Sequence, residues 1–385
     1  MSNNIKIFVA SSFLLSLFSC TSQSINSQYT KGIEGVLDSL VPALLRDSKV
    51  PGVQIAVIRG GKISFAKGYG YADIIRKKKV TNETIFQIGS VSKSLTAWGV
   101  MKLAEEGKIN IDSPIVNYIK RWRFPLSSYD ITKVTVRKVL SHTAGLNVRG
   151  YNGVFLPNQK LISLAGSLSG YKGSDGGLSL VREPGSEAIY SSGGYTLLQM
   201  LIEDVSERTF AEFITESIFI PLGMTKSVYT WNHDLAKKVA TPYNANQEQY
   251  PHYQFVEQGS GGCYTTASDL AKFVAQIFQI DSSTLNSAVL SKEAIKSMIS
   301  PAENTNGLYG LGYKLFPVSE KVHLIAHDGA NDGWRAQFMI DPISGDGLVV
   351  LINSDEGGKI VAPIICSVFG QTKVDMSPLC NSLKK

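Results

Sequence analysis

The chain of 385 residues is long enough to bury one large hydrophobic core or two smaller ones. Hydrophobic residues make up 43% of it and charged residues 18%, which is typical of a globular protein and excludes a disordered one. The net charge of +6 falls to +5 without residues 1–19, whose only charged residue is Lys6. This mild basicity does not indicate a nucleic-acid partner, and the basic run at 76–79 is expected to be a solvated loop.

The N-terminus has the features of a targeting segment. Lys6 supplies a short positive region, and residues 7–18 form an apolar stretch too short to span a bilayer. The stretch ends in Leu17-Phe18-Ser19-Cys20, which resembles the lipobox of bacterial lipoproteins, where the cysteine is acylated. We therefore predict a signal peptide over 1–19, a tether over 20–30, and an exported protein anchored in the membrane through Cys20. Simple secretion with cleavage nearby is the alternative.

The mature body is predicted to begin with an amphipathic helix, because apolar residues recur at helical spacing from Ile33 to Leu45. Residues 53–58, the Gly60-Gly61 turn and the run that follows predict a β-hairpin. Helical patterns dominate from about 86 to 300, including 196–206, 210–219 and 267–280. The Gly- and Ser-rich stretch 147–180 is too long for a connector and predicts a rim or lid.

Strand patterns return after residue 305. Four strands are predicted, over 310–316, 321–327, 334–341 and 347–353. A last apolar run predicts a closing helix over 358–369. The predicted class is α+β, with one antiparallel sheet built from both chain ends and flanked by helices. We expect one domain over 31–370, with sheet parts at about 31–85 and 305–370, a helical part at about 86–304, and a tail at 371–385. The cleft between the two parts is the natural place for a site.

The chain contains four Ser-x-x-Lys sequences, so the motif alone carries little information: Ser64/Lys67, Ser90/Lys93, Ser169/Lys172 and Ser382/Lys385. The first lies on a predicted strand, where residues three apart point to opposite faces. The third lies in a glycine-rich loop and the fourth at the C-terminus. Only Ser90 and Lys93 precede a plausible buried helix, whose first turn places a lysine beside a serine.

This pair suits nucleophilic catalysis. A serine hydroxyl is a weak nucleophile at neutral pH and needs a base held next to it. A desolvated lysine has a lowered pKa and can accept the proton. Neither a nucleophile elbow around Ser90 nor a metal-binding pattern such as His-Glu-x-x-His is present in the sequence. His323 and His327 are about 13 Å apart if they lie on one strand, so they are not expected to share a metal ion.

Two later motifs complete a resemblance. Tyr190-Ser191-Ser192 follows a Pro-Gly turn, and His327-Asp328-Gly329 ends a late strand. With Ser90-x-x-Lys93, the chain resembles the penicillin-recognising serine hydrolases of the class C β-lactamase type over about residues 35 to 355. That family includes D-alanyl-D-alanine carboxypeptidases, D-aminopeptidases and esterases, and its motifs are Ser-x-x-Lys, Tyr-x-Asn and Lys- or His-x-Gly. Supporting stretches lie at 140–146 and 261–273.

The resemblance assigns roles. It implies that Ser90 attacks a carbonyl and that Lys93 and Tyr190 share its proton, with the base left open between them. It implies an oxyanion hole from the backbone N–H groups of Ser90 and Ala330. Gly329 suits a position where the backbone must approach the substrate closely. Tyr195 and Trp334 are expected in the aromatic core, and His142 in a structural turn.

The departures from the family motifs indicate the substrate. Ser192 stands where asparagine is usual, so it can reach Lys93 but holds an acylamino group less well. His327 removes a permanent positive charge, and Asp328 adds a negative one if its side chain faces the cleft. Neutral His327 as the working form predicts that activity falls as the pH drops through about 6 to 7.

These features predict an enzyme that hydrolyses small esters, peptide-like amides or cell-wall peptides through an acyl-enzyme. They predict weak β-lactamase activity at most, and no cofactor or metal. The alternatives are a penicillin-binding sensor or scaffold that acylates without turnover, and a true β-lactamase. Besides Cys20 the chain has Cys263, Cys366 and Cys380, and export permits a bond between the last two, which sequence does not decide.

Overall fold

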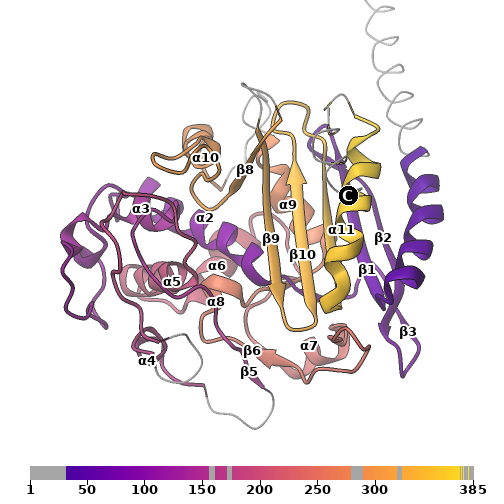
Figure 1. The fold of residues 1–385 in the computed structure, drawn as a ribbon, viewed down its shortest axis with the longest axis horizontal. Coiled ribbons are helices and arrows are strands. Elements are labelled where there is room, and N and C mark those ends of the chain that lie inside the picture. The colour runs from indigo at the N-terminus through magenta and orange to yellow at the C-terminus, as the bar shows by residue number, and fades with distance from the viewer. Residues whose placement is uncertain are drawn as a thin grey trace, which may run out of the picture.

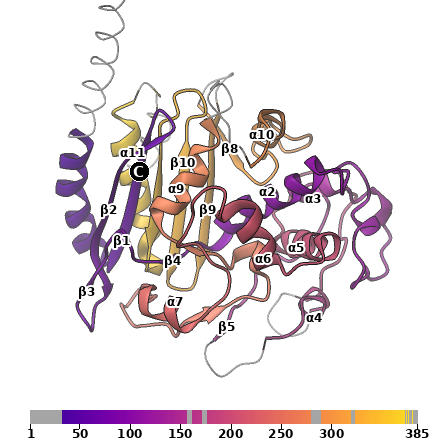
Figure 2. The same cartoon turned by 180° about the vertical axis from the view of Figure 1, so that it is seen from behind.

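The computed structural model describes residues 32–155, 161–170, 176–278, 289–318, 323–372, 374, 376 and 380. A β-sheet with helices on both faces stands beside a block of helices (Figure 1), and the view from behind shows the same two parts (Figure 2). The predicted signal peptide, the tether and Cys20 lie outside the described residues.

The sheet is assembled from both ends of the chain, as predicted. Its seven strands run in the order β3-β2-β1-β11-β10-β9-β8, and each neighbouring pair is antiparallel. Strand β1 pairs with β11 from Val53 opposite Ile352 to Ile58 opposite Gly347, which joins the two ends at the centre of the sheet. The strands are β1 (Gly52–Arg59), β2 (Lys62–Asp73), β3 (Lys78–Lys79), β8 (Lys314–Pro317), β9 (His323–Asn331), β10 (Trp334–Ile340) and β11 (Gly347–Ile352).

One face of the sheet is covered by two helices from opposite chain ends. The helix over residues 32–48 and α11 (Gly358–Phe369) lie side by side on it. The period-2 alternation of β1 explains this packing, because Val53, Ile55 and Val57 belong to the core under these helices. Ala56 and Ile58 on the same strand belong to the second core on the other face. The predicted N-terminal and closing helices are confirmed.

The other face of the sheet carries α9 (Ala267–Ala275), which contacts β1, β2 and β11. Its position corrects the expected boundary, since the sequence placed 86–304 in the helical part. The apolar residues Leu270, Phe273 and Val274 of α9 are fully buried in the core of this face. The apolar stripe of an amphipathic helix indicates that one side of the helix is buried, but it does not indicate which element buries it.

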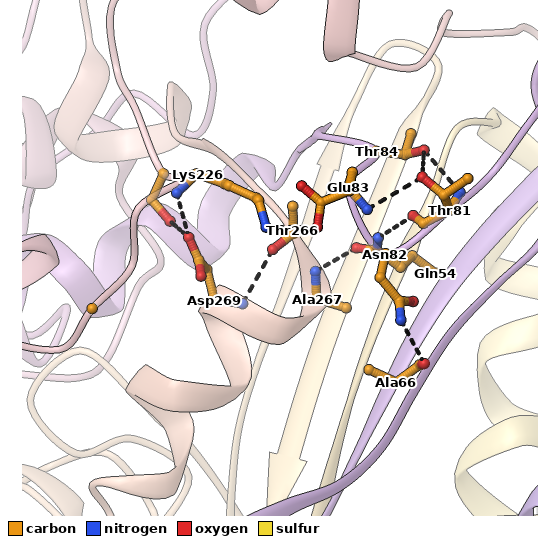
Figure 3. A network of polar contacts seen from close by, with 12 residues as sticks. Gln54, Ala66, Thr81, Asn82, Glu83, Thr84, Lys226, Thr266, Ala267 and Asp269 are labelled. Atoms are coloured by element: carbon orange, nitrogen blue, oxygen red, sulfur yellow. Dashed lines mark hydrogen bonds and ion pairs between the residues drawn. The ribbon is translucent and has the colours of Figure 1, made fainter.

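Polar contacts fix α9 and the start of the helical block to β1 (Figure 3). The Gln54 side chain on β1 accepts a hydrogen bond from the Ala267 N–H at the start of α9 and donates one, at 2.6 Å, to the Thr81 carbonyl. Thr266 caps α9 by accepting from the Asp269 N–H at 3.2 Å. The loop at 81–84, which leads into the helical block, is therefore tied to the same strand as α9.

The helical block contains a helix that is buried on nearly all sides. Eleven residues of α2 (Ser92–Glu105) are buried, and α2 packs against α5 and α8. Gly99 permits close packing against α5 and α6, because a Cβ there would lie 3.0 Å from Ile202 Cδ1 and 2.8 Å from Ile214 Cδ1. The other helices are α3 (Val136–Leu140), α4 (Leu164–Leu168), α5 (Ser192–Ser206), α6 (Phe210–Ile214) with a π-turn over Thr215–Phe219, α7 (His233–Lys238), α8 (Gln258–Gly261) and α10 (Lys292–Ile299).

Short elements connect the block to the sheet. A 3-10 turn, η1 (Gly89–Val91), follows β4 and leads directly into α2. The further short elements are β4 (Phe86–Gln87), β7 (Tyr264–Thr265), β5 (Val154–Phe155), β6 (Tyr253–Gln254), η2 (Ile115–Asn117), η3 (Ile131–Lys133) and η6 (Asp355–Gly357). Only part of the predicted rim at 147–180 is described, and it contains β5 and α4.

Two details were not settled by the sequence. Lys78 and Lys79 form β3 with exposed side chains, so the basic run is a solvated strand edge as well as a turn. Cys366 and Cys380 form a disulfide bond, which answers the question that the sequence left open.

Candidate active site

Ser90 lies in the turn η1, where the chain passes from the sheet to the helical block. Gly89 adopts a positive φ of 49°, which a residue with a side chain seldom takes. The Ser92 hydroxyl donates to the Gly89 carbonyl at 2.7 Å and accepts from the Cys263 N–H at 3.1 Å. The middle serine of the motif thus fixes the turn to the segment that contains β7, and Ser90 is held at the N-terminal end of α2.

Lys93 lies one turn along from Ser90 and is completely buried, with 0% of its surface exposed. Its Nζ lies 3.0 Å from Ser90 Oγ and donates to the Ser260 carbonyl at 2.6 Å. Burial lowers the pKa of Lys93 to about 7, with the Asp328 carboxylate opposing this effect and the Lys314 ammonium adding to it. A buried amine of this kind is available as a proton acceptor near neutral pH.

The carbonyl that holds Lys93 belongs to a turn clamped by two helices. Gln199 on α5 accepts from the Gly259 N–H at 2.9 Å and donates to the Val256 carbonyl at 3.0 Å. Thr96 on α2 donates to the Gly259 carbonyl at 2.7 Å. The role of Ser260 could not be identified from the sequence, because every residue type has a backbone carbonyl. The Gly-rich stretch at 259–262 is compatible with a tight turn.

Tyr190 lies next to Ser191, the N-cap residue of α5, and its ring centroid lies 5.0 Å from Lys93 Nζ. Burial raises the pKa of the Tyr190 phenol, and its hydrogen bond with the Ser90 hydroxyl partly opposes this. Ser191 caps α5 by accepting from the Gly194 N–H at 2.9 Å, which fixes the backbone next to the tyrosine. Tyr190, which is distant in the sequence from Ser90 and Lys93, therefore meets that pair in one place.

His142 packs against the ring of Tyr190 and holds the backbone of the residue that follows it. Its ring packs on the Tyr190 ring at 4.6 Å between centroids, and its Nδ1 accepts from the Ser191 N–H at 3.2 Å. Burial lowers the pKa of His142 well below its ordinary value. His142 also has a positive φ of 63°, so the predicted turn conformation is present. The sequence gave no sign that this turn residue touches the motif tyrosine.

Ser192 departs from the expectation that it reaches Lys93. Its hydroxyl donates to the Arg149 carbonyl at 2.8 Å, and the residue is buried. The backbone at 147–149 runs along the start of α5, where Gly193 allows the close approach of Val148.

The third motif lies on β9, whose alternation separates its side chains. His327 is buried, with 2% of its surface exposed, whereas Asp328 is exposed. His327 Nδ1 is 2.7 Å from the Asp328 carbonyl oxygen, which is a pure acceptor, so Nδ1 carries the proton and donates. Burial lowers the pKa of His327 to about 4. This lowered pKa argues against His327 as the group behind a loss of activity between pH 6 and 7, which stays a prediction that the pH profile of the activity tests.

Asp328 does not face the same side of β9 as His327. Its carboxylate forms an ion pair with the Lys314 ammonium on β8, and 52% of the Asp328 side chain is exposed. Lys314 was not selected from the sequence. The pair offsets the negative charge that Asp328 was expected to add to the cleft.

The β9 backbone approaches the serine turn very closely. A Cβ on Gly329 would lie 2.0 Å from the Ile88 carbonyl oxygen and 2.9 Å from Ser90 N, and one on Gly89 would lie 2.9 Å from Ala330 N. These two glycines therefore allow the backbone around Ala330 to lie directly against the backbone around Ser90. Tyr195 and Trp334 are buried core residues, as expected, and the Tyr195 hydroxyl donates to the Leu140 carbonyl at 2.7 Å.

Of the other three Ser-x-x-Lys sequences, only Ser64/Lys67 lies wholly within the described residues. Ser64 donates to the Val57 carbonyl at 3.2 Å, and Lys67 pairs with Asp38 at 2.7 Å. These two residues have separate partners on opposite sides of β2. Of the two Ser-x-x-Lys sequences that the structure describes in full, only Ser90 and Lys93 bring the serine and the lysine together.

Comparison with known proteins indicates the same family as the motifs, and the matches extend over most of the chain. Protein flp of Staphylococcus aureus (strain MRSA252) is 25% identical over 333 residues, which are 84% of this chain but only 64% of that protein's length. Penicillin-binding protein 4* of Bacillus subtilis (strain 168) is 28% identical over 349 residues, covering 82% of this chain and 72% of that protein.

A solved structure agrees in fold. The octameric penicillin-binding protein homologue from Pyrococcus abyssi is 27% identical, with a TM-score of 0.71 over 91% of this chain and 80% of that one. The family model described as Beta-lactamase matches residues 37–363, which include Ser90, Lys93, Tyr190 and His327. The chain therefore belongs to the beta-lactamase family, whose members are typically serine hydrolases.

Proposed function

We propose that this protein is a serine hydrolase that cleaves small esters or peptide-like amides through an acyl-enzyme on Ser90. The observation that carries the proposal is the buried Lys93 amine, 3.0 Å from Ser90 Oγ and with a pKa lowered to about 7. Near neutral pH about half of such an amine is unprotonated and can act as a base.

In the proposed reaction the Ser90 hydroxyl proton passes to Lys93 while Oγ forms a bond to the substrate carbonyl carbon. The oxyanion accepts hydrogen bonds from the N–H groups of Ser90 and Ala330. The bond to the leaving alcohol or amine then breaks, and this group takes the proton from Lys93 through the Tyr190 hydroxyl. Water then attacks the acyl carbon and gives a proton to Lys93, the bond from that carbon to Ser90 Oγ breaks, and Oγ takes the proton back, which releases the acid and restores Ser90. Lys93 is preferred as the base because burial raises the pKa of Tyr190.

The surroundings of the motifs favour these substrates over β-lactams. Ser192 is engaged with the Arg149 carbonyl and offers no amide to an acylamino group. His327 is neutral at physiological pH because burial lowers its pKa to about 4, so it supplies no cation for a substrate carboxylate. We expect a β-lactam kcat/KM far below about 10⁶ M⁻¹s⁻¹, a value within the range of efficient enzymes.

A second candidate is a penicillin-binding protein that is acylated and then stalls. The names of two relatives, Penicillin-binding protein 4* and the penicillin-binding protein homologue, favour it. It shares Ser90 and Lys93 with the first proposal and differs in deacylation alone.

We also propose that the protein is exported and acts in the cell envelope, with Cys20 as its lipid anchor. The Cys366–Cys380 disulfide supports export, because such bonds persist in oxidising compartments. Within the described part of the chain, no helix has the length and apolar character needed to cross a bilayer. Cell-wall peptides are accordingly among the candidate substrates. Metabolic labelling with a radioactive fatty acid, on wild type and Cys20→Ala, tests the anchor.

An intact-mass time course tests the function. The purified protein and its Ser90→Ala variant are each mixed with benzylpenicillin or with p-nitrophenyl acetate. A transient adduct on the wild type alone, with acid accumulating from the ester, is the expected result. A lasting penicillin adduct without product favours the second candidate. If neither reagent modifies the wild type, the assignment of Ser90 as nucleophile is wrong.

A further inference from the structure

An apolar groove lies beside the catalytic motifs, on the face of the sheet that α11 covers. It has a volume of about 420 Å³ and runs between α11 and the outer strands β8 to β10. Its apolar wall consists of Phe316, Met339, Val361, Ala362 and Ile365. We call it the α11 groove. Its size is within the range of pockets that bind small ligands.

The groove follows from the architecture. Seven strands at about 4.8 Å spacing span about 29 Å, whereas two helices of about 10 Å diameter cover about 20 Å of that width. The helix at 32–48 and α11 pack on the central strands, and β8 and β9 are the last two strands at one edge. Apolar residues on the outer strands are therefore left beside α11 without a further helix among the described elements.

The α11 groove meets the surroundings of the candidate active site at β9, but on the opposite face of the sheet: its wall residues Met339, Val361 and Ile365 belong to the core under α11, whereas Ile88 and Val91, which flank Ser90, belong to the other core. Gly329 and Ala330 line the groove, and the same two residues are at the close approach to Gly89 and Ser90. Strand β8 pairs with β9 only as far as Ala326, so residues 327–331 of β9 are not paired with β8. A substrate chain attached to a carbonyl at Ser90 would have to cross this edge of β9 to reach the groove.

Charge at the groove is paired. Asp328 lines it and forms an ion pair with Lys314. Arg335 lines it too, pairs with Asp355 at 3.3 Å, and donates to the Asn331 carbonyl at 2.9 Å. Because each charge already has an opposite partner, an ionic ligand gains little there, while an uncharged apolar chain removes apolar wall from water.

We propose that the α11 groove binds an uncharged, apolar chain of the substrate, carried on either the acyl or the alcohol side of the scissile bond. This inference rests on the proposed function, and it adds a substrate class: esters or amides with an extended alkyl group. Each methylene that enters the groove is expected to raise kcat/KM by up to about fourfold.

The test compares chain lengths in variants that fill the groove. Ala362→Phe and the smaller Ala362→Leu place bulk into it, and Lys359→Phe places the same ring on an exposed position of α11 that does not line it. p-Nitrophenyl acetate and octanoate vary the acyl side, and methyl and octyl acetate vary the alcohol side. The long-to-short ratio of kcat/KM is expected to fall at least fivefold in Ala362→Phe, less in Ala362→Leu, and not in Lys359→Phe.

The side on which this ratio falls identifies where the chain is carried. An equal ratio for wild type and Ala362→Phe on both sides overturns the proposal, as does a wild type that shows no preference for octyl groups.

A measurement without turnover separates this proposal from the proposed function. The uncharged dye N-phenyl-1-naphthylamine, which fluoresces in apolar sites, is titrated into the wild type, Ala362→Phe and Lys359→Phe, and is then displaced with 1-octanol. At least fivefold weaker dye binding in Ala362→Phe alone supports the groove even if no ester is cleaved. Ester turnover together with equal dye binding in all three proteins refutes the groove and leaves the proposed function standing.

Discussion

Two copies of one short motif in this chain show how strongly the surroundings decide chemistry. Ser90 and Lys93 begin a buried helix, and Lys93 Nζ lies 3.0 Å from Ser90 Oγ with no exposed surface. Ser64 and Lys67 lie on β2, where 41% of the Lys67 side chain is exposed and its ammonium pairs with Asp38. The residue types and their spacing are identical. Only the first pair has the geometry and the low-dielectric surroundings that turn a lysine into a base.

The backbone explains the difference. A helix places residues three apart on one face, whereas a strand places them on opposite faces. Ser64 also lies at an irregularity, because Phe65 pairs with Val57 and Ile63 pairs with Ile58, which leaves no residue of β1 opposite Ser64 in the strand register. Its hydroxyl donates back to the Val57 carbonyl. A Ser-x-x-Lys sequence is therefore informative only with its secondary structure.

The largest expected effect contrasts the two serines. Ser90→Ala removes the proposed nucleophile, so kcat/KM for p-nitrophenyl acetate is expected to fall by about 10⁴-fold or more. Ser64→Ala removes one hydroxyl at a partly buried strand irregularity and is expected to leave kcat/KM within about twofold. Steady-state hydrolysis of both variants, purified in parallel, provides the check. A Ser64→Ala loss as large as that of Ser90→Ala would end the comparison.

The two lysines give the next contrast. Lys93→Met keeps the length and apolar stem of the side chain, and it is expected to lower kcat/KM by about 10²- to 10⁴-fold through loss of the base. Lys67→Met breaks an exposed ion pair and is expected to cost less than about 1 kcal/mol of unfolding free energy, with unchanged hydrolysis. Urea unfolding and ester kinetics on both variants measure the two effects. Full activity in Lys93→Met would exclude it as the base.

The smallest effect concerns pH. With a Lys93 pKa of about 7, the neutral amine increases as the pH rises, so kcat/KM is expected to fall about tenfold per unit below pH 7 and to level off above it. His327, with its pKa lowered to about 4, does not titrate there, so His327→Gln is expected to keep this limb within about half a unit. Profiles from pH 5 to 9 on both proteins decide the matter. A limb that disappears in His327→Gln would return the assignment to the histidine.

Much of the fold could be predicted because its signals are local. The alternation of apolar residues in 53–58 and 347–353 indicated strands, and the helical spacing from Ile33 to Leu45 indicated a helix, before any partner was known. The position of α9 could not be predicted in this way. Its apolar stripe shows that one face is buried, but two cores were available, and long-range packing chose the sheet.

The candidate site divides along the same line. The motif side chains Ser90, Lys93, Tyr190 and His327 could be named from sequence order, and the structure shows where they lie. The partners that adjust them could not be named. Lys93 donates a hydrogen bond to the backbone carbonyl of Ser260, and Ser192 donates one to the backbone carbonyl of Arg149. Every residue has a carbonyl, so no residue type marks these contacts.

The sequence by itself determined the helices and strands and the order of the motifs. It also determined which Ser-x-x-Lys precedes a helix that places the lysine beside the serine. These features depend on residue type and short spacing. Tertiary structure alone decided the depth of burial, and with it the protonation of the site. Desolvation depends on everything that surrounds a group, so it lowers the pKa of Lys93 to about 7 and that of His327 to about 4, where the residue types alone gave no such values. It also decided that Asp328 meets Lys314 rather than the cleft, since the pairing of β8 with β9 brings these two residues together across the sheet.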